Sequence, residues 1–139
     1  SKFYFEDPGV RNAILGFRQI EFSHMMENVL YNELCSRGYT VDIGLVETFE
    51  KNEQGKTVRK VFEVDYVVNR GSQRIYLQSA YMLPDKEKND QEQRPLIKIN
   101  DNFRKVIISG DYMRGFYNED GIYRIGVYNF LLDRNCLNE

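Results

Sequence analysis

The sequence has few of the residues that build metal knuckles, disulfide frameworks or membrane spans. Its 139 residues include two cysteines, one histidine, three prolines and no tryptophan. Cys35 and Cys136 are far apart and show no C-x-x-C spacing, so we expect two reduced thiols and no zinc knuckle or disulfide framework. No apolar run approaches the about 20 residues that cross a bilayer. Because the start, S-K-F-Y-F-E-D-P, also lacks signal-peptide character, we expect a cytoplasmic protein with no membrane partner.

Charge is also nearly balanced. The chain has 19 basic and 21 acidic side chains and a net charge of −2, which argues against a surface dominated by phosphate binding. The pattern G-x-x-x-x-G-K-[ST] is missing, so we expect no P-loop ATP site in this chain. The hydrophobic fraction of 42% fits one globular domain over residues 1–139. Since the sequence does not start with methionine, we expect a fragment of a longer protein.

Two helices are predicted near the start of the chain. Asp7 fits an N-cap and Pro8 the first position of a short entry helix. Ser23 fits the N-cap of a second helix, which ends at Gly38, a residue suited to a left-handed C-cap. Glu27 lies beside the apolar stripe of this second helix.

From Tyr39 the hydrophobic period changes to two, which is typical of strands. A charged helical segment is predicted next, at 85–93, with a break at Arg94-Pro95-Leu96. The last helical turn is predicted from Asn129 to Asp133. The predicted strands are 39–49, 57–69, 74–83, 104–109 and 122–128, with turns at 52–55 and 69–72. This order, α-β-β-β-α-β with a further strand and short helix, predicts an α/β fold with a mixed central sheet flanked by helices.

The two strands within Val61–Tyr81 have the geometry of an acidic site. Alternation places Glu63 and Asp65 on one face of the first strand, and Gln78 and Ala80 on one face of the second. Metal-dependent phosphodiester hydrolysis needs oxygen ligands on rigid elements and a cation that stabilises the developing charge. Asp65 is the leading ligand candidate because its carboxylate interrupts an apolar run, where a metal, a basic side chain or solvent must compensate it. An exposed strand face without any site stays open as the alternative.

These segments together resemble a known family. The helix M-E-N-V-L-Y-N-E-L, the strands E-V-D-Y-V-V and I-Y-L-Q-S-A-Y and the order of elements are similar to the restriction-endonuclease-like PD-(D/E)xK fold. The resemblance is closest to the domain that follows the P-loop module in a widespread group of prokaryotic AAA-type ATPases of unknown function. F-E-D-P-G-V-R-N-A-I-L-G-F, R-P-L-I-K-I and Y-N-F-L-L-D extend it over almost the whole chain. It implies a missing N-terminal ATPase domain as a partner, and DNA as another.

The resemblance assigns roles to four positions. Glu27 matches the helix glutamate that often holds a metal-bound water, and Asp65 matches the metal-binding aspartate. Gln78 stands at the Glu or Gln position of the next strand, and the Ser79 carbonyl matches the usual backbone ligand. The implied cofactor is Mg²⁺ or Mn²⁺, bound weakly because Gln78 lacks a negative charge.

Ala80 stands where active nucleases have lysine. Losing one charge-stabilising donor typically costs a factor of about 10² to 10³ in rate, so efficient catalysis is in doubt. Lys98 and Arg74 are the nearest candidates for a substitute cation, while the single histidine, His24, is expected on a helix surface. We therefore expect a degenerate, non-catalytic module for nucleic-acid binding or regulation. The alternatives are an active metal-dependent nuclease that uses Lys98, and a protein-interaction domain.

Overall fold

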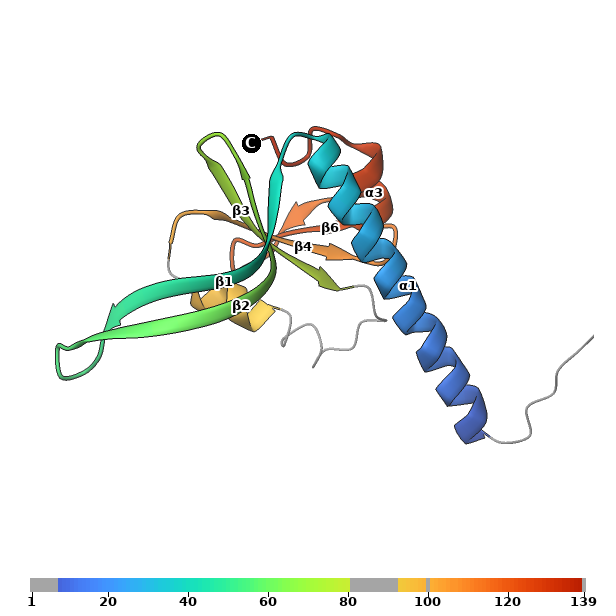
Figure 1. Ribbon diagram of the computed structural model, residues 1–139, viewed down its shortest axis with the longest axis horizontal. Helices are drawn as coiled ribbons and strands as arrows, with labels where there is room; N and C mark the ends of the chain where they lie inside the picture. Colours follow the sequence, from blue (N-terminus) through green and yellow to red (C-terminus); the bar gives the residue numbers. More distant parts are fainter. Residues whose placement is uncertain (1–7, 81–92, 100, 139) are drawn as a thin grey trace, which may run out of the picture.

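The computed structural model describes residues 8–80, 93–99 and 101–138 and has the predicted order of elements (Figure 1). A short helix at 93–98 lies between β3 and β4. The other elements are α1 (Pro8–Ser36), β1 (Thr40–Lys51), β2 (Thr57–Arg70), β3 (Gln73–Ala80), β4 (Arg104–Ser109), β5 (Phe116–Tyr117), β6 (Tyr123–Gly126) and α3 (Val127–Leu132). The end of the strand predicted over 74–83, residues 85–92 of the helix predicted over 85–93, and the proposed cap at Asp7 lie outside the described residues.

The strands form one mixed sheet of six strands in the order β1-β2-β3-β4-β6-β5. The first three strands are an antiparallel meander, as predicted, and their turns contain Gly55 and Gly71 at φ +76° and +60°. β4 pairs parallel to both β3 and β6. Parallel neighbours require a crossover. The connection from β3 to β4 contains the short helix 93–98, and the connection from β4 to β6 contains β5. The α/β class and the mixed sheet are therefore confirmed, while the two-residue strand β5 was not predicted.

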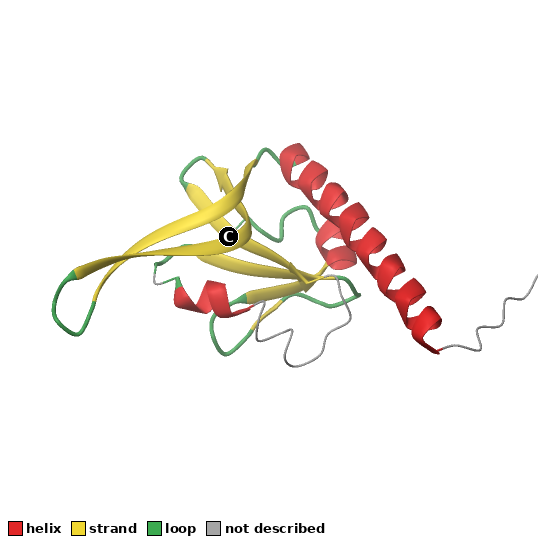
Figure 2. Ribbon diagram, turned by 60° about the horizontal axis from the view of Figure 1, so that its bottom comes forward, coloured by secondary structure: helices red, strands yellow, loops and turns green. Residues whose placement is uncertain are grey.

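Helices cover both faces of this sheet. Successive residues of β3 and β4 pack alternately on the two sides, as a pleated strand requires. The core on the first face joins the sheet to α1 and α3 through Leu30, Leu34, Ile75, Leu77, Val106, Ile108 and Phe130. The core on the second face, where Figure 2 shows the short helix, contains Val46, Val64, Tyr76, Leu96, Ile99, Ile107 and Ile122. Both layers are therefore anchored on the central strands.

The N-terminal prediction of two helices was wrong, because α1 is one continuous helix of 29 residues. Residues 17–23 contain no proline or glycine that would break it. Ser23, the predicted N-cap, lies in the middle of the helix. The predicted end is confirmed: Gly38, at φ +89°, donates its N–H to the Cys35 carbonyl at 3.0 Å, and Tyr39 donates to the Leu34 carbonyl at 3.1 Å. This pair of bonds is a Schellman motif. In Figures 1 and 2 the first half of α1 projects beyond the sheet.

Two further boundaries differ from the predictions. Pro95 lies inside the helix 93–98, where a break was expected, and the neighbouring Leu96 is fully buried in the second core. The strand predicted over 122–128 ends at Gly126, and Val127 already begins α3. Both Val127 and Phe130 are buried against the first face of the sheet. Tertiary packing thus decided both boundaries against the local pattern.

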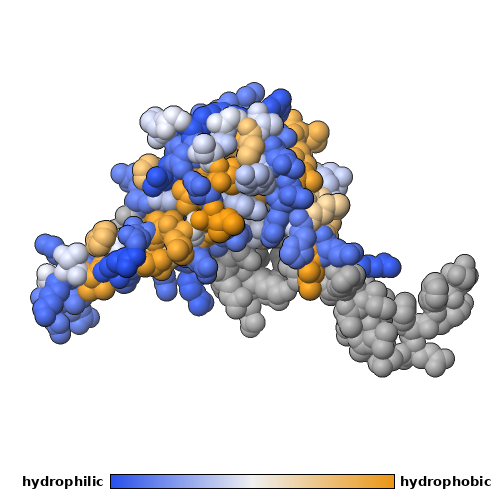
Figure 3. All heavy atoms as spheres, in the orientation of Figure 1, coloured by the Kyte–Doolittle hydropathy of each residue, from blue (hydrophilic) through white to orange (hydrophobic). Residues whose placement is uncertain are grey.

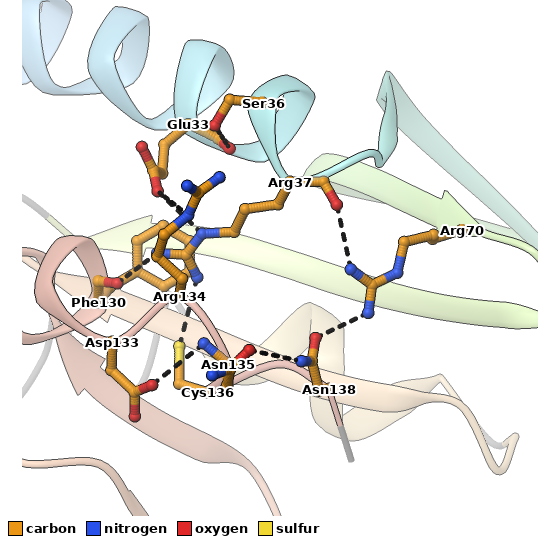
Figure 4. A network of polar contacts seen from close by, with 10 residues as sticks. All are labelled: Glu33, Ser36, Arg37, Arg70, Phe130, Asp133, Arg134, Asn135, Cys136 and Asn138. Atoms are coloured by element: carbon orange, nitrogen blue, oxygen red, sulfur yellow. Dashed lines mark hydrogen bonds and ion pairs between the residues drawn. The ribbon is translucent and has the colours of Figure 1, made fainter.

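One buried arginine joins the end of α1 to the C-terminal segment (Figure 4). The Arg37 guanidinium donates to the Phe130 carbonyl at 2.6 Å and to Glu33 at 3.0 Å, and lies 4.1 Å from the centre of the Phe130 ring. Its third contact is the Cys136 sulfur at 3.6 Å. Cys35 and Cys136 are both free thiols, as predicted. Burial raises the pKa of Cys136, which the neighbouring Arg37 partly offsets.

Candidate functional site

Asp65 lies in a β-bulge. In the pairing of β1 with β2, Asp42 faces Val67 and Gly44 faces Val64, so Asp65 and Tyr66 together lie opposite the single residue Ile43. An extra residue in one strand of a pair changes the direction of the side chains that follow it.

The change of direction is visible in the packing of β2. Before the bulge, Phe62 and Val64 pack on the second face of the sheet; after it, Tyr66 and Val68 pack on the first face, with α1. The bulge at Asp65 therefore moves the even-numbered side chains of β2 from the second face of the sheet to the first.

The carboxylate of Asp65 is held by Ser79 on the neighbouring strand β3. Its Oδ2 atom accepts a hydrogen bond from the Ser79 backbone N–H at 2.8 Å and a second from the Ser79 hydroxyl at 2.8 Å. The backbone N–H of Asp65 donates to Gln78 Oε1 at 2.7 Å. The compensation that a carboxylate in an apolar strand needs thus comes from neutral donors.

Glu27 and Asp65 line one shallow, open hollow of about 380 Å³ between α1 and the base of β2. Glu63 and Tyr66 also line it. Burial, together with the negative charges of Glu27 and Asp65, raises the pKa of Tyr66 to about 12. The hollow is consequently acidic, and its tyrosine stays protonated at neutral pH.

Gln78 is placed differently from the other predicted ligands. Its side chain is only 6% exposed and does not line the hollow. Alternation along β3 puts it on the face of Tyr76 and Ala80, whereas Ser79 continues the face of Leu77, which packs with α1. The structure therefore brings Glu27 and Asp65 to one hollow, and links Gln78 to Asp65 only through the backbone.

The candidate cations lie away from the hollow. Ala80 packs against the second core, and Lys98 is exposed on the short helix that covers that core. Arg74 donates to the Asn69 side chain at 3.0 Å and lies over the Phe103 ring. Neither Lys98 nor Arg74 lines the hollow that contains Glu27 and Asp65.

Over the ranges that the structure describes, no three His, Cys, Asp or Glu side chains form a group that could hold a metal ion. Glu27 and Asp65 supply two oxygen ligands, and the Oε1 of Gln78 is already engaged by the Asp65 N–H. His24 is exposed in the middle of α1 and lines an adjacent hollow of about 440 Å³ together with Glu27. The predicted ligand set is thus only partly assembled.

The residues that sequence reasoning missed are the Ser79 side chain, Tyr66 and Ile43. One signal was present, because a glycine inside a strand pattern often marks a bulge. Gly44 lies beside the bulge, and a Cβ atom there would come within 2.6 Å of Val64 and 2.8 Å of Val67. The close approach of two strands at this point explains the glycine.

Comparison with known proteins finds a relative that is longer than this chain. It is 29% identical over 135 residues to an uncharacterized protein of Haemophilus influenzae, a match that covers 95% of this chain and 29% of that protein. No family model matches the chain, and no solved structure matches it. In the part of the chain that the structure describes, no helix is both long enough and apolar enough to span a membrane.

Proposed function

We propose that this chain is a degenerate PD-(D/E)xK domain that no longer cleaves nucleic acid and acts as a binding or regulatory module. The observation that carries the proposal is the state of Asp65, whose Oδ2 is saturated by two donors from Ser79. In a working site of this class, the carboxylate oxygens bind metal and a lysine stabilises the transition state. Here the lysine position is Ala80, which packs into the second core.

The proposal rests on the arrangement of elements as well. Glu27 on the helix before the sheet, Asp65 on β2 and Ser79 on β3 lie close together, as the resemblance to the PD-(D/E)xK fold implies. The neutral Gln78 and the apolar Ala80 remove one negative and one positive charge from that arrangement. Divalent metal binding at Glu27 and Asp65 is accordingly expected to be weak.

The larger protein is proposed to be an AAA-type ATPase. This chain has no P-loop motif, so ATP binding belongs to a domain N-terminal to it. The chain matches 29% of the length of its relative, so the rest of that protein is long enough to contain such a domain. In this proposal, the domain formed by this chain binds a partner and thereby regulates the ATPase domain, or is itself regulated by it.

A protein partner fits the hollow better than a nucleic acid does. The hollow is lined by Glu27, Glu63 and Asp65, and by no lysine or arginine among the described residues. Phosphate groups require basic side chains, and an acidic surface repels them. We therefore favour protein binding over DNA binding at this face.

The test of lost catalysis is a cleavage assay. The purified chain is incubated with Mg²⁺ or Mn²⁺ and with single- and double-stranded DNA and RNA, beside Asp65→Ala and Lys98→Ala variants. We expect no cleavage above that of the Asp65→Ala protein. Cleavage that Asp65→Ala abolishes would overturn the proposal, and its additional loss in Lys98→Ala would identify an active nuclease with a displaced lysine.

A further inference from the structure

Strand β1 is a long free edge of the sheet. It comprises 12 residues without proline, and of the described strands only β2 pairs with it. An edge strand presents unpaired N–H and C=O groups, and proteins usually protect such edges with short strands, prolines or charged side chains. β1 is neither short nor broken by proline, and Ile43–Val46 form an uncharged stretch within it, so the backbone of this part is open to an added strand.

An apolar stripe runs along the same strand. Ile43, Leu45 and Phe49 lie on the same face of β1, which α1 covers only at the base of the sheet. Their side chains are 91%, 69% and 67% exposed. Val61 of β2 lies opposite Glu47 and adds to the stripe. Figure 1 shows the β1–β2 hairpin projecting away from α1, and hydrophobic side chains gather over its inner half in Figure 3. Apolar residues exposed in this concentration on one element mark an interaction surface.

The charges around the stripe are acidic and unneutralised at its base. Glu27, Glu63 and Asp65 line the hollow that contains Ile43, and the side chains of Glu27 and Glu63 make no ion pair or hydrogen bond with a described residue. Asp42 lies on the other face of β1, in a hollow that Arg74 also lines. Farther along the hairpin the acidic residues do have partners. Arg59 pairs with Glu47, and Lys60 pairs with Glu50 at 3.0 Å. The base of β1 therefore favours a cationic partner.

A second copy of the chain would bring carboxylates into unfavourable positions at this edge. Two antiparallel registers pair nearly all of β1 with another β1. One places Leu45 opposite Leu45 but Ile43 opposite Glu47, and the other places Ile43 opposite Phe49 but Asp42 opposite Glu50. Like charges in directly opposed positions destabilise a strand pair, and a lone carboxylate opposite an apolar side chain adds nothing.

We propose that the free edge of β1 docks an extended segment of another protein that contains lysine or arginine among apolar residues. The backbone of the segment pairs with β1, its apolar side chains cover Ile43, Leu45 and Phe49, and cations on the same face of the segment lie near Glu27 and Glu63. Backbone pairing supplies affinity in this mode of recognition, and alternate side chains supply specificity. The inference deepens the proposed binding role and rests on it, but does not depend on the loss of nuclease activity.

The probe is a fluorescein-labelled peptide, Val-Thr-Lys-Thr-Ile-Thr-Lys, in which the apolar and lysine side chains share one face of the strand. It is titrated with the complete chain and followed by fluorescence anisotropy at low and high salt. We expect binding that weakens with salt and that shifts the backbone amide resonances of β1 in nuclear magnetic resonance spectra. Two comparison peptides, one with glutamate in place of both lysines and one with proline in place of the isoleucine, are expected to bind at least about tenfold more weakly.

Matched variants locate the binding site on the protein. Ile43→Lys and Phe49→Lys change side chains that are already exposed, and each is expected to lower the affinity about tenfold. Glu63→Gln is expected to lower the affinity a few fold and to reduce the salt dependence. The controls are Leu132→Lys on α3, where the side chain is 84% exposed, and Glu119→Gln, and neither is expected to change binding.

Three results would overturn the inference. The first is that the lysine peptide does not bind at about 1 mM. The second is that Ile43→Lys binds the peptide as tightly as the unchanged chain does. The third is that light scattering shows a dimer which Ile43→Lys dissociates. The last result would assign the edge to a second copy. The cleavage assay above is independent of all three, so failure of this inference is distinguishable from failure of the proposed loss of catalysis.

Discussion

At the scale of single residues, Asp65 has a structural role. Its carboxylate joins β2 to β3 at the bulge by accepting both the N–H and the hydroxyl of Ser79. A carboxylate that serves metal binding or catalysis is usually unfavourable for stability, and its removal then stabilises the fold. A carboxylate that satisfies partly buried donors has the opposite effect.

Replacing Asp65 by alanine is therefore expected to lower the free energy of unfolding by about 1–3 kcal/mol, since the Ser79 donors lose their acceptor. Ser79→Ala, which removes one of the two bonds, is expected to cost about 1 kcal/mol. Urea denaturation measures both values. Glu63→Ala, an exposed neighbour on the same strand, is the control and should change stability by less than about 0.5 kcal/mol. Stabilisation by Asp65→Ala would point to an inherited active site instead.

Buried tyrosines make stability depend on alkaline pH, and burial raises the pKa of Tyr123 in the same direction as those of Tyr66 and Tyr76. Burial raises the pKa of Tyr66 and of Tyr76 from 10.0 to about 12, and Tyr76 is also held protonated by its 2.7 Å hydrogen bond to Asp101. Between these pH values the folded chain binds more protons than the unfolded chain. The contribution of both groups is thus complete below pH 10 and is lost as the pH rises towards about 12.

An absorbance titration of tyrosinate tests this expectation. Of the ten tyrosines, Tyr66 and Tyr76 should ionise well above the ordinary range, so Tyr66→Phe and Tyr76→Phe should each remove part of the late phase. The decline in stability between pH 10 and about 12 should become shallower in both variants. A late phase that neither substitution alters would contradict the assignment.

At the scale of elements, α1 shows how a local capping signal can mislead. Ser23 is a good N-cap residue, yet its hydroxyl is buried inside the continuous helix and has no hydrogen-bond partner among the described residues. Serine in a helix interior is a poorer helix former than alanine. The two interpretations of Ser23 consequently predict opposite effects of the same substitution.

In the continuous helix, Ser23→Ala is expected to raise the free energy of unfolding by about 0.5–1 kcal/mol, because an unsatisfied hydroxyl is removed and a better helix former is introduced. Loss of a true N-cap would instead cost about 1 kcal/mol. Thermal and urea unfolding give the sign. Ser36→Ala, where the exposed hydroxyl bonds the Glu33 carbonyl at 2.8 Å, is the control and should be neutral or slightly destabilising.

At the scale of the whole molecule, Arg37 fastens the end of α1 to α3 and to the C-terminal segment. One guanidinium reaches Glu33, the Phe130 carbonyl and Cys136, while Arg70 donates to the Arg37 carbonyl at 3.0 Å (Figure 4). A lysine has a single charged nitrogen and cannot reproduce these contacts. The packing of the first layer therefore depends on this side chain.

Arg37→Lys is expected to lower the free energy of unfolding by about 2–3 kcal/mol, because buried acceptors lose their donors. The matched control is Arg134→Lys, an exposed arginine 4.0 Å from the same Glu33, which should cost less than about 0.5 kcal/mol. Chemical denaturation compares the two variants directly. Equal effects would show that the buried contacts of Arg37 contribute no more to stability than an exposed ion pair does.

The sequence by itself determined the class of fold and most of its elements. Period-two runs and glycine turns predicted the meander, because hydrophobic alternation and positive φ are local properties. The apolar run 106–108 likewise predicted a strand buried on both faces, and Val106, Ile107 and Ile108 are fully buried. Gly38 predicted the end of α1 for the same reason.

Only the tertiary structure decided the chemistry of the site. The bulge at Asp65 depends on how β2 registers against β1, and the bonds to Ser79 depend on a strand that lies 14 residues farther along the chain. Such pairings between distant residues leave little trace in local periodicity. The continuity of α1 and the helix around Pro95 were likewise decided by packing, which outweighs propensities of a few tenths of a kcal/mol. The sequence thus determined which residues were candidates, and the tertiary contacts determined what holds Asp65 in place.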